Sequence, residues 1–422
     1  MWKVEFYLIW RLLWIGFVCL IMGDNAEMYI VYVTGGFASK DKEILGGMPN
    51  YIYKMAKYMK KQGHSVTILT PGVEQKEWSY DGIPVYNIAI PQFLYKENIY
   101  IRTLLFPAVR DILFNRALSV LNKREKISIV QYAGWFGVGM LYNRKFPSVI
   151  RLSIFSKVQL YARHSEKELK LMTVAEKMAA KRFDLIIAPS RAIGKPYGEA
   201  VKRKVHIIKT PYYKADVAKE ADDFYKRKLN GKRYFLFFGR VSPDKGILTI
   251  GRTIKAVLQK QKGCLFCFAG PVEVSNGENM MRYLKKQAGE HADRVLYLGN
   301  LTHDKLFPVI RNAECIVMPS LMDNLPNGCL EAMELNGIVI GTRGASFDEI
   351  FKDGYSGLLI NIDDEKALEK KIEQVMQMTS VEKQEMRKHA KERLDVYKPE
   401  KVGRKMETLY RRVISGRQEK KS

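Results

Sequence analysis

The sequence has few of the residues that build metal centres, disulfide frameworks and nucleic-acid-binding modules. Only 5 cysteines and 6 histidines occur among 422 residues, and their spacing fits neither a zinc site nor a set of disulfides. There is no aromatic signature of an RNA-binding module, and the basic residues are spread along the chain. We therefore expect no metal ion and no nucleic-acid partner.

Two of the cysteines, Cys264 and Cys267, have the C-x-x-C spacing of redox and metal sites. They lie in an apolar run, residues 263–270, which is typical of a buried parallel strand. We interpret both as core residues, and free thiols indicate a reducing compartment.

Acidic residues are in deficit. The chain has 45 Asp and Glu against 70 Lys and Arg, a formal charge of +25. Such an excess attracts anions and says nothing about the fold. With nucleic acid disfavoured, anionic lipid and a sugar diphosphate remain as partners, and an anionic membrane surface fits well.

A long apolar run is also missing. Residues 12–22 are apolar without interruption, but a membrane-spanning helix needs about 20 such residues. Three interpretations of residues 1–27 remain open: an extension upstream of a true start at Met28, a membrane-associating segment, and a cleaved signal. Residues 28–33 have the pattern of a first strand.

The rest of the chain alternates between short apolar strands and amphipathic helices, in two successive series. This pattern predicts two doubly wound α/β domains of Rossmann-like topology. We place the N-terminal domain at residues 28–213, a charged linker at 214–233, the C-terminal domain at 234–395 and a last helix with a basic tail at 396–422. No G-x-G-x-x-G follows the first strand, so a dinucleotide site is not predicted.

The most informative stretch is residues 319–333. Residues 323–328 stop a strand and turn the chain, and a helix is predicted to begin with Asn327 or Gly328 at its N-cap. Free N–H groups at Gly328, Cys329 and Leu330, together with the helix dipole, would bind a diphosphate. Glu331 in the same helix can accept two sugar hydroxyls. The stretch therefore predicts a site for a nucleotide-activated sugar.

This stretch resembles the C-terminal signature of the retaining GT-B glycosyltransferases called family four. The resemblance rests on the acidic residue at 323, on Glu331-Ala-Met and on a following strand that ends in Thr-x-Gly. Residues 237–246 resemble the family's second signature. The resemblance implies the GT-B fold, in which two Rossmann-like domains face each other across a cleft and the last helix crosses back to the N-terminal domain.

The resemblance also implies roles for individual residues. Arg240 and Lys245 would contact the donor diphosphate, Glu331 the ribose and Asp323 the transferred sugar, where the family usually has Glu. Further donor-binding candidates are Gly46, Gly47, Gly239, Asn327, Gly328, Cys329, Leu330 and Gly344. No metal ion or cofactor is implied, and the anomeric configuration would be retained.

Each assignment has a plainer alternative. The two cations could be solvated surface charges, and Glu331 could be an ordinary acid near a helix N-terminus. The Gly46-Gly47 pair, which the resemblance places opposite the donor, could simply begin a helix. Residues 99–122 form a basic amphipathic segment, interrupted by Pro107, that fits either anionic lipid or core packing.

On the acceptor side, aromatic residues follow or end a predicted strand. Tyr132, Trp135 and Phe136 are candidates for stacking on an acceptor sugar or lipid. Ser153 stands where many family members have an active-site histidine. The expected function is therefore transfer of a sugar from a nucleotide-diphosphate donor to a glycan or lipid-linked acceptor, in surface polysaccharide or lipopolysaccharide synthesis at the cytoplasmic face of a membrane. A catalytically inactive GT-B subunit and a sugar-nucleotide epimerase are the alternatives.

Overall fold

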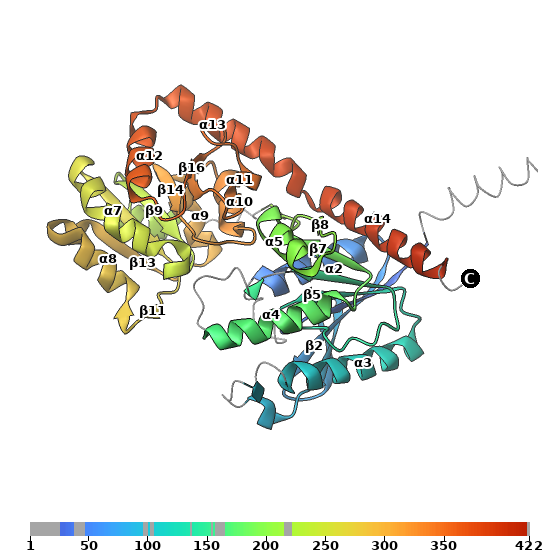
Figure 1. The fold of residues 1–422 in the computed structure, drawn as a ribbon. Helices are drawn as coiled ribbons and strands as arrows, with labels where there is room; N and C mark the ends of the chain where they lie inside the picture. The colour runs from blue at the N-terminus through green and yellow to red at the C-terminus, as the bar shows by residue number, and fades with distance from the viewer. Residues whose placement is uncertain are drawn as a thin grey trace, which may run out of the picture.

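The computed structural model describes residues 26–37, 47–95, 100–101, 105–135, 137–152, 155–156, 165–214 and 222–419 (Figure 1). The predictions for Gly46, Phe136, Ser153 and residues 1–25 lie outside these ranges. The described chain forms two lobes, each built on a largely parallel sheet with helices on both faces. The two doubly wound α/β domains predicted from the sequence are confirmed.

The N-terminal lobe contains an eight-stranded sheet of order β3-β4-β2-β1-β5-β6-β7-β8. Its strands are β1 (Tyr29–Val33), β2 (Ser65–Gly72), β3 (Lys76–Tyr80), β4 (Ile83–Ala89), β5 (Ile129–Gly134), β6 (Ser148–Leu152), β7 (Leu185–Ala188) and β8 (His206–Ile207). Its helices are α2 (Gly47–Lys61), α3 (Phe106–Arg124), α4 (Glu166–Ala180) and α5 (Arg191–Val201), with a 3-10 turn η1 (Gln92–Tyr95).

Strand β1 shows how this sheet is buried on both faces. Its residues alternate, as side chains on a strand must. Val31 and Val33 pack into one core with Phe114 of α3, and Ile30 packs into another with Met55 of α2. A strand buried on both sides has an unbroken apolar sequence, which is why it could be predicted.

The C-terminal lobe contains a six-stranded parallel sheet of order β13-β10-β9-β14-β15-β16. Its strands are β9 (Arg233–Phe238), β10 (Cys264–Ala269), β13 (Val295–Gly299), β14 (Cys315–Met318), β15 (Val339–Thr342) and β16 (Leu358–Ile360), with a small hairpin of β11 (Val274–Ser275) and β12 (Glu278–Asn279). Its helices are α6 (Asp222–Lys228), α7 (Ile247–Lys260), α8 (Met280–Ala288), α9 (His303–Arg311), α10 (Asn327–Glu334), α11 (Phe347–Ile350), α12 (Glu365–Gln377) and α13 (Ser380–Arg393), with 3-10 turns η5 (Pro243–Lys245), η6 (Gly289–Arg294) and η7 (Leu394–Tyr397).

The cysteines of this lobe lie in its core. Cys264, Cys267, Cys315 and Cys329 are all buried free thiols, and burial raises the pKa of Cys267 to about 12. A thiol with such a pKa is neither a good nucleophile nor a good metal ligand at neutral pH. The interpretation of the C-x-x-C pair as core is confirmed.

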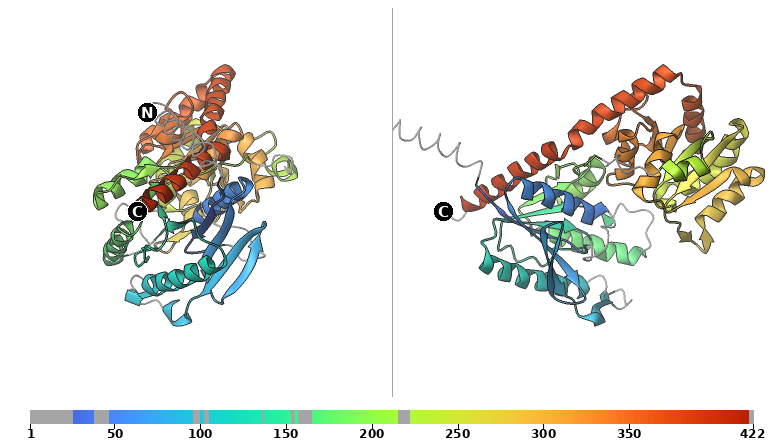
Figure 2. Two further views of the ribbon diagram at one scale, coloured as in Figure 1. Left: turned by 90° about the vertical axis from the view of Figure 1, so that its right-hand side faces the viewer. Right: turned by 180° about the vertical axis from the view of Figure 1, so that it is seen from behind.

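The last helix, α14 (Pro399–Gln418), returns from the C-terminal lobe to the N-terminal one (Figure 2). It packs against α2, and a Cβ at Gly403 would lie 2.2 Å from a ring carbon of Tyr58, so only glycine permits this approach. Farther along, the buried hydroxyl of Tyr410 lies 3.3 Å from that of Tyr32 in β1. The crossing helix implied by the family resemblance is therefore present.

Two regions differ from the prediction. The stretch 214–233, expected to be a linker with little structure, contains α6, and Leu229 just after it is fully buried in the core of the C-terminal lobe. In the segment 99–122, Pro107 lies in the first turn of α3 and does not interrupt it. Phe114 and Leu118 on that helix are buried, so the core-packing alternative is the one observed. Among the described residues, no helix is both long and apolar enough to span a bilayer.

Candidate functional site

Two loops meet at the carboxyl ends of the C-terminal lobe's strands. One follows β9 and the other follows β14, and the N–H of Leu321 donates to the carbonyl of Asp244 at 3.0 Å. Gly246 makes the approach possible. It has φ +79°, and a Cβ there would lie 1.9 Å from the carbonyl oxygen of Pro319. A glycine at this point therefore brings the two sequence signatures together.

Lys245 and Asp323 come into direct contact across these loops. The Nζ of Lys245 lies 2.5 Å from Oδ2 of Asp323. Both side chains are largely buried, with 28% and 14% exposure. The backbone carbonyl of Asp323 in turn accepts a hydrogen bond of 2.7 Å from Ser346. A cation and a carboxylate are thus held together at the entrance to α10.

Helix α10 begins one residue earlier than the prediction. Pro326 is its N-cap, and Asn327 and Gly328 line the cavity described below. The N–H of Cys329 is already bonded to the carbonyl of Pro326 at 2.9 Å. The side chains of Cys329 and Leu330 are fully buried in the hydrophobic core. Cys329 therefore does not offer the free N–H that the prediction required, and anion binding by the N–H groups at positions 327 and 328 stays a prediction.

Glu331 lies on the side of α10 that faces the cavity. Its Oε1 is 4.0 Å from Nε2 of His303. Burial raises the pKa of the Glu331 carboxyl, and His303 and Lys54 partly oppose this rise. Burial also lowers the pKa of Lys54, which belongs to the N-terminal lobe. A carboxylate, an imidazole and an amine from both lobes thus share one electrostatic environment.

Glu331 and His303 line a cavity of about 420 Å³. It lies at the carboxyl ends of β9, β10, β13 and β14, where ligands bind in open α/β sheets. The sequence-predicted residues that line it are Gly47, Gly239, Lys245, Asp323, Asn327, Gly328 and Glu331. Gly47, at the start of α2, comes from the opposite lobe, so the cavity lies between the two lobes.

Arg240 and Gly344 are not among the lining residues. The guanidinium of Arg240 is 2.8 Å from Asp244 and 3.9 Å from Glu273, and its side chain is 43% exposed. Gly344 lies on the surface, with φ +78°. Of the two predicted cations, Lys245 lines the cavity and Arg240 does not.

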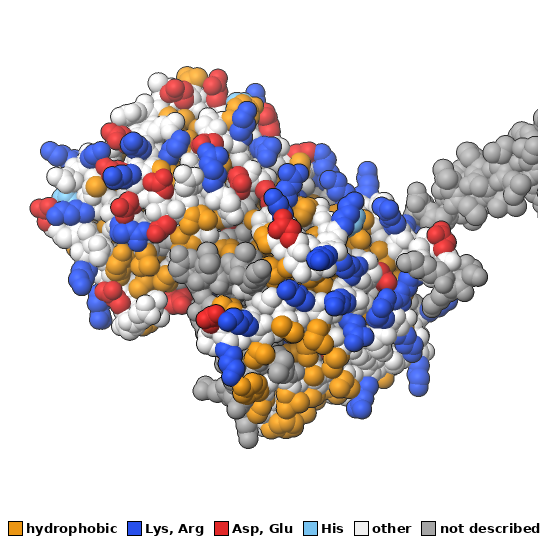
Figure 3. Space-filling model, viewed as in Figure 1, with side chains coloured by type: hydrophobic (Ala, Val, Ile, Leu, Met, Phe, Trp, Pro, Cys, Tyr) orange, Lys and Arg blue, Asp and Glu red, His pale blue; other side chains and the backbone are white. Residues whose placement is uncertain are grey.

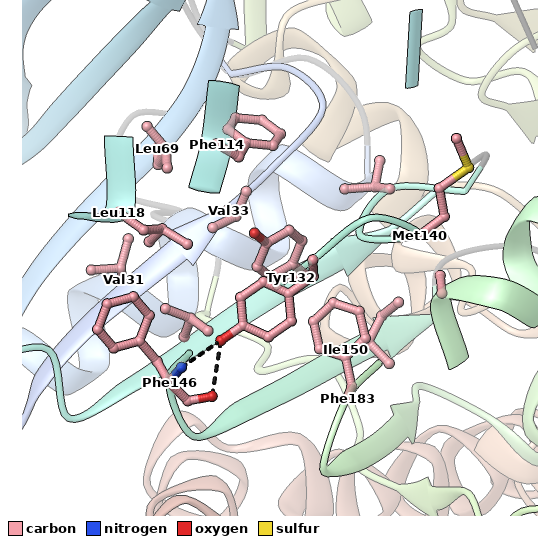
Figure 4. Packing of buried hydrophobic residues seen from close by; sticks show 14 of the residues in the cluster. Val31, Val33, Leu69, Phe114, Leu118, Tyr132, Met140, Phe146, Ile150 and Phe183 are labelled. Carbon is pink, nitrogen blue, oxygen red and sulfur yellow. Dashed lines mark hydrogen bonds between the residues drawn. The ribbon is translucent and has the colours of Figure 1, made fainter. Parts of the chain in front are cut away.

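Tyr132 was predicted to contact an acceptor, and the structure contradicts this. The ring is fully buried between Phe114, Tyr142 and Phe183. Figure 4 labels Tyr132 together with Phe114 and Phe183 in this core. Tyr132 lies within β5, where its side chain points into the sheet's core face and not toward the strand end. Trp135, just beyond that strand, is 39% exposed, and its role in acceptor binding stays a prediction.

Several lining residues were not predicted. They include Gly270, directly after β10, Asn300, directly after β13, and His303, at the start of α9. Their positions after β10 and β13 were a usable signal, because all parallel strands of one sheet end at the same edge. Lys54 does not line the cavity but interacts electrostatically with Glu331. It had no such signal, since it comes from the middle of a helix in the other lobe.

The lobes are also joined beside the cavity. Glu349 of α11 accepts hydrogen bonds from the N–H groups of Arg191 and Ala192, at 2.5 and 3.2 Å, and its second oxygen is 2.9 Å from Nζ of Lys209. A carboxylate of one lobe therefore caps helix α5 of the other. Ser346 extends this contact, because its Oγ lies 3.0 Å from Oγ of Ser190.

In the described part of the chain, no group of three or more His, Cys, Asp or Glu residues is placed to hold a metal ion. Independence from metals stays a prediction. The positive charge of Lys245 and the N–H groups of α10 are the anion-binding elements that the described residues place in the cavity.

Comparison with known families covers most of the chain. The profile described as "Glycosyl transferases group 1" matches residues 218–393, and that described as "Glycosyltransferase Family 4" matches residues 45–212. The boundary between the two matches falls near the junction of the two lobes. Each lobe therefore carries its own family match.

Individual relatives are distant. The phosphatidylinositol N-acetylglucosaminyltransferase GPI3 subunit of Saccharomyces cerevisiae is 21% identical over 320 residues, covering 72% of this chain and 67% of the yeast protein. A Campylobacter jejuni protein is 28% identical over 204 residues, 47% of this chain and 52% of its own length. Its name describes an alpha-1,4-N-acetyl-D-galactosaminyltransferase acting on an undecaprenol-diphosphate glycan.

Solved structures share the whole architecture. Sucrose-phosphate synthase from Thermosynechococcus elongatus superposes with a TM-score of 0.69 at 17% identity, covering 92% of this chain and 100% of the other. A trehalose-6-phosphate protein from E. coli, solved with UDP-2-fluoro glucose, gives 0.71 at 12% identity, covering 91% and 99%. The GT-B fold extends over both lobes.

Proposed function

The chain belongs to the group 1 glycosyltransferases with the GT-B fold, and on this premise we propose that its interlobe cavity binds a nucleotide-diphosphate sugar. The observation that carries the proposal is the meeting of Lys245, Asp323 and the start of α10 around one cavity with Glu331. These groups offer a cation, amide N–H donors and two carboxylates. A leaving diphosphate and a set of sugar hydroxyls need that combination.

Lys245 and the start of α10 bind the diphosphate. Its negative charge grows as the bond to the sugar breaks, and preorganised donors then stabilise the transition state more than the ground state. Lys245 now pairs with Asp323, so the incoming diphosphate takes over the ammonium group. Asp323 is thereby released to accept hydroxyls of the transferred sugar.

Glu331 binds the ribose in this proposal. Its burial disfavours the charged form, and two ribose hydroxyl donors compensate for that cost when the nucleotide enters. His303 beside it reinforces the ionised state when protonated. The carboxylate thus acts in recognition, and no protein nucleophile is assigned.

The acceptor enters from the N-terminal lobe, beside Trp135. A glycan or lipid-linked acceptor is supported by the names of the yeast and Campylobacter relatives. We place the protein on the cytoplasmic face of a membrane, in cell-surface polysaccharide or lipopolysaccharide synthesis, with retention of the anomeric configuration. In that stereochemistry, an oxygen of the donor's own phosphate takes the acceptor proton.

Purified protein incubated with a panel of nucleotide sugars tests the proposal. Binding of one donor, with slow nucleotide release that an acceptor extract accelerates, supports a transferase. Binding followed by conversion to an epimeric nucleotide sugar without an acceptor supports an epimerase. No binding of any donor supports an inactive GT-B subunit and contradicts the proposal.

A further inference from the structure

Another hollow lies at the opposite edge of the N-terminal sheet. It has a volume of about 740 Å³ and shares no residue with the interlobe cavity. Asp184 precedes β7, Lys204 precedes β8 and Arg144 precedes β6, so the hollow lies at the amino ends of these strands. The interlobe cavity faces the carboxyl ends, and the two sites are therefore separate.

This hollow, which we call the basic cavity, is lined by six Lys and Arg side chains and one carboxylate. The cations are Arg144, Lys181, Arg203, Lys204, Arg412 and Arg417, and the carboxylate is Asp184. They come from α14, from the ends of α4 and α5 and from the turn before β6. Figure 3 shows Lys and Arg side chains gathered over this side of the N-terminal lobe, with few acidic ones.

The single carboxylate does not neutralise the cavity. One oxygen of Asp184 accepts from Arg417 at 3.1 Å, and the other accepts from the backbone and hydroxyl of Ser148 at 2.9 and 3.0 Å. Arg203 is held by the carbonyls of Phe183 and Asp184, at 2.9 and 3.0 Å. Hydrogen bonds thus hold Arg203 and Arg417 in place at the base of the cavity.

Four further cations line the basic cavity: Arg144, Lys181, Lys204 and Arg412. All four are exposed, and within the described ranges no hydrogen bond or ion pair is recorded for their side chains. Some cations elsewhere on this lobe do have partners, such as Lys57 with Asp81 at 2.8 Å. Cations gathered around one hollow raise the local positive potential, and this potential attracts anions.

His206 lies in the wall of the basic cavity, and two of the cavity's cations affect its pKa. Its pKa is lowered by burial and further by Lys204 and Arg412. The ring therefore stays neutral and adds a hydrogen-bonding group to the wall without adding charge.

We propose that the basic cavity is a second ligand site, which binds a phosphate-bearing anion. Arginine forks and lysine ammonium groups are the side chains that recognise phosphate oxygens. The phosphate could be carried by a lipid headgroup or by a small molecule in solution. The cavity is independent of the donor site, and transfer to a soluble acceptor does not require it.

The start of the described chain favours the lipid source. Ala26 lies at the same sheet edge, and its carbonyl accepts a hydrogen bond from Arg411 of α14 at 3.1 Å. The apolar run at residues 12–22 ends four positions before Ala26 in the sequence. An apolar run in the sequence and a basic cavity in the same chain are the combination that holds a protein on an anionic membrane.

Two charge-matched variants of the full chain test the site. Lys204→Ala with Arg412→Ala removes two cavity cations, and Arg116→Ala with Lys123→Ala removes two exposed cations of α3. Equal melting temperatures would show that both variants are folded, and Lys181→Ala serves as a further cavity variant. The probes are phosphatidylcholine vesicles with or without phosphatidylglycerol, and inorganic pyrophosphate added to protein that carries Lys245→Ala to disable the donor site.

We expect the wild type to bind the anionic vesicles and the cavity variant to bind them roughly tenfold or more weakly, with little change in the α3 variant. This result assigns the phosphate to a lipid headgroup. Pyrophosphate binding that only the cavity variant loses, without vesicle binding, assigns it to a soluble ligand. Equal losses in both double variants, or no binding of either probe, would overturn the proposal.

Discussion

The ammonium group of Lys245 lies 2.5 Å from the carboxylate of Asp323, although the two residues are 78 positions apart in the chain. Each belongs to a different sequence signature, and their contact joins the two signatures at the edge of the interlobe cavity. The carboxylate holds the cation in place at this edge. Donor binding exchanges that partner for a diphosphate, so the geometry of the pair is a direct test of the proposed function.

Replacing Lys245 with alanine should weaken transfer without unfolding the protein. A charge-assisted hydrogen bond contributes about 1.5–3 kcal/mol, so we expect kcat/KM to fall by roughly tenfold to a hundredfold or more. Lys262→Ala, at an exposed position, is the control for loss of one positive charge. Wild-type kinetics in Lys245→Ala would remove this residue from the donor site.

Gly246→Ala should separate the two signature loops. The new Cβ would lie 1.9 Å from the carbonyl oxygen of Pro319, so the loops must move apart and donor affinity should be lost. Gly231→Ala is the matched control, with φ +72° and no atom within 4 Å of the added Cβ. It should cost only the roughly 1–2 kcal/mol of a left-handed backbone. Equal donor affinity in both variants, measured by calorimetry, would contradict the prediction.

Glu176 should make stability depend on pH. This buried carboxyl accepts hydrogen bonds from the backbone and hydroxyl of Ser156, at 3.1 and 2.8 Å, and burial raises its pKa to about 7. A raised pKa means that the folded state holds the proton more tightly. Its stabilising effect is therefore complete below the unfolded pKa, near 4.5, and is lost as the pH rises through about 7.

Glu176→Gln keeps the shape of this side chain and removes its titration. The variant should match the wild type in urea unfolding at acidic pH and exceed it by up to about 3 kcal/mol above neutrality, since one pKa unit corresponds to about 1.4 kcal/mol. Glu199→Gln, at an exposed position, should follow the wild type throughout. A constant difference at every pH would show that ionisation of Glu176 is not the cause.

Glu349→Ala should loosen the junction of the lobes. It removes the cap on α5 and the partner of Lys209, and the loss of a helix cap costs about 1 kcal/mol. We expect a KM for the donor about fivefold higher and a larger radius of gyration in small-angle scattering. Asp348→Ala, one position earlier and exposed, is the control. Unchanged scattering together with unchanged KM would mean that this contact does not hold the lobes together.

Regular elements of this fold could be predicted because their signals are local. The buried strand expected within residues 263–270 is confirmed as β10 (Cys264–Ala269), an apolar run that lies between glycines at 263 and 270. The side on which Tyr132 packs could not be predicted, since a strand buried on both faces gives no sign of which neighbours each side chain meets. Arg240 did carry a local signal, because Asp244 stands four residues on and pairs with it.

Contacts between the lobes could not be predicted from the sequence. Lys54 approaches Glu331 from the middle of α2, and Glu349 caps a helix that begins 158 positions earlier. Neither contact has a periodicity or a motif, because it depends on how two separately folded lobes meet. The prediction that the N–H of Cys329 is free was also wrong. The helix begins one residue earlier than predicted, so this N–H donates to a carbonyl of the helix's own first turn.

A crystal structure with a bound nucleotide-diphosphate sugar tests the donor site most directly. We predict that the diphosphate lies within hydrogen-bonding distance of Nζ of Lys245 and of the N–H groups at Asn327 and Gly328, with Asp323 released onto the sugar and Glu331 on the ribose. A donor bound elsewhere, with Lys245 still paired to Asp323, would contradict the assignment.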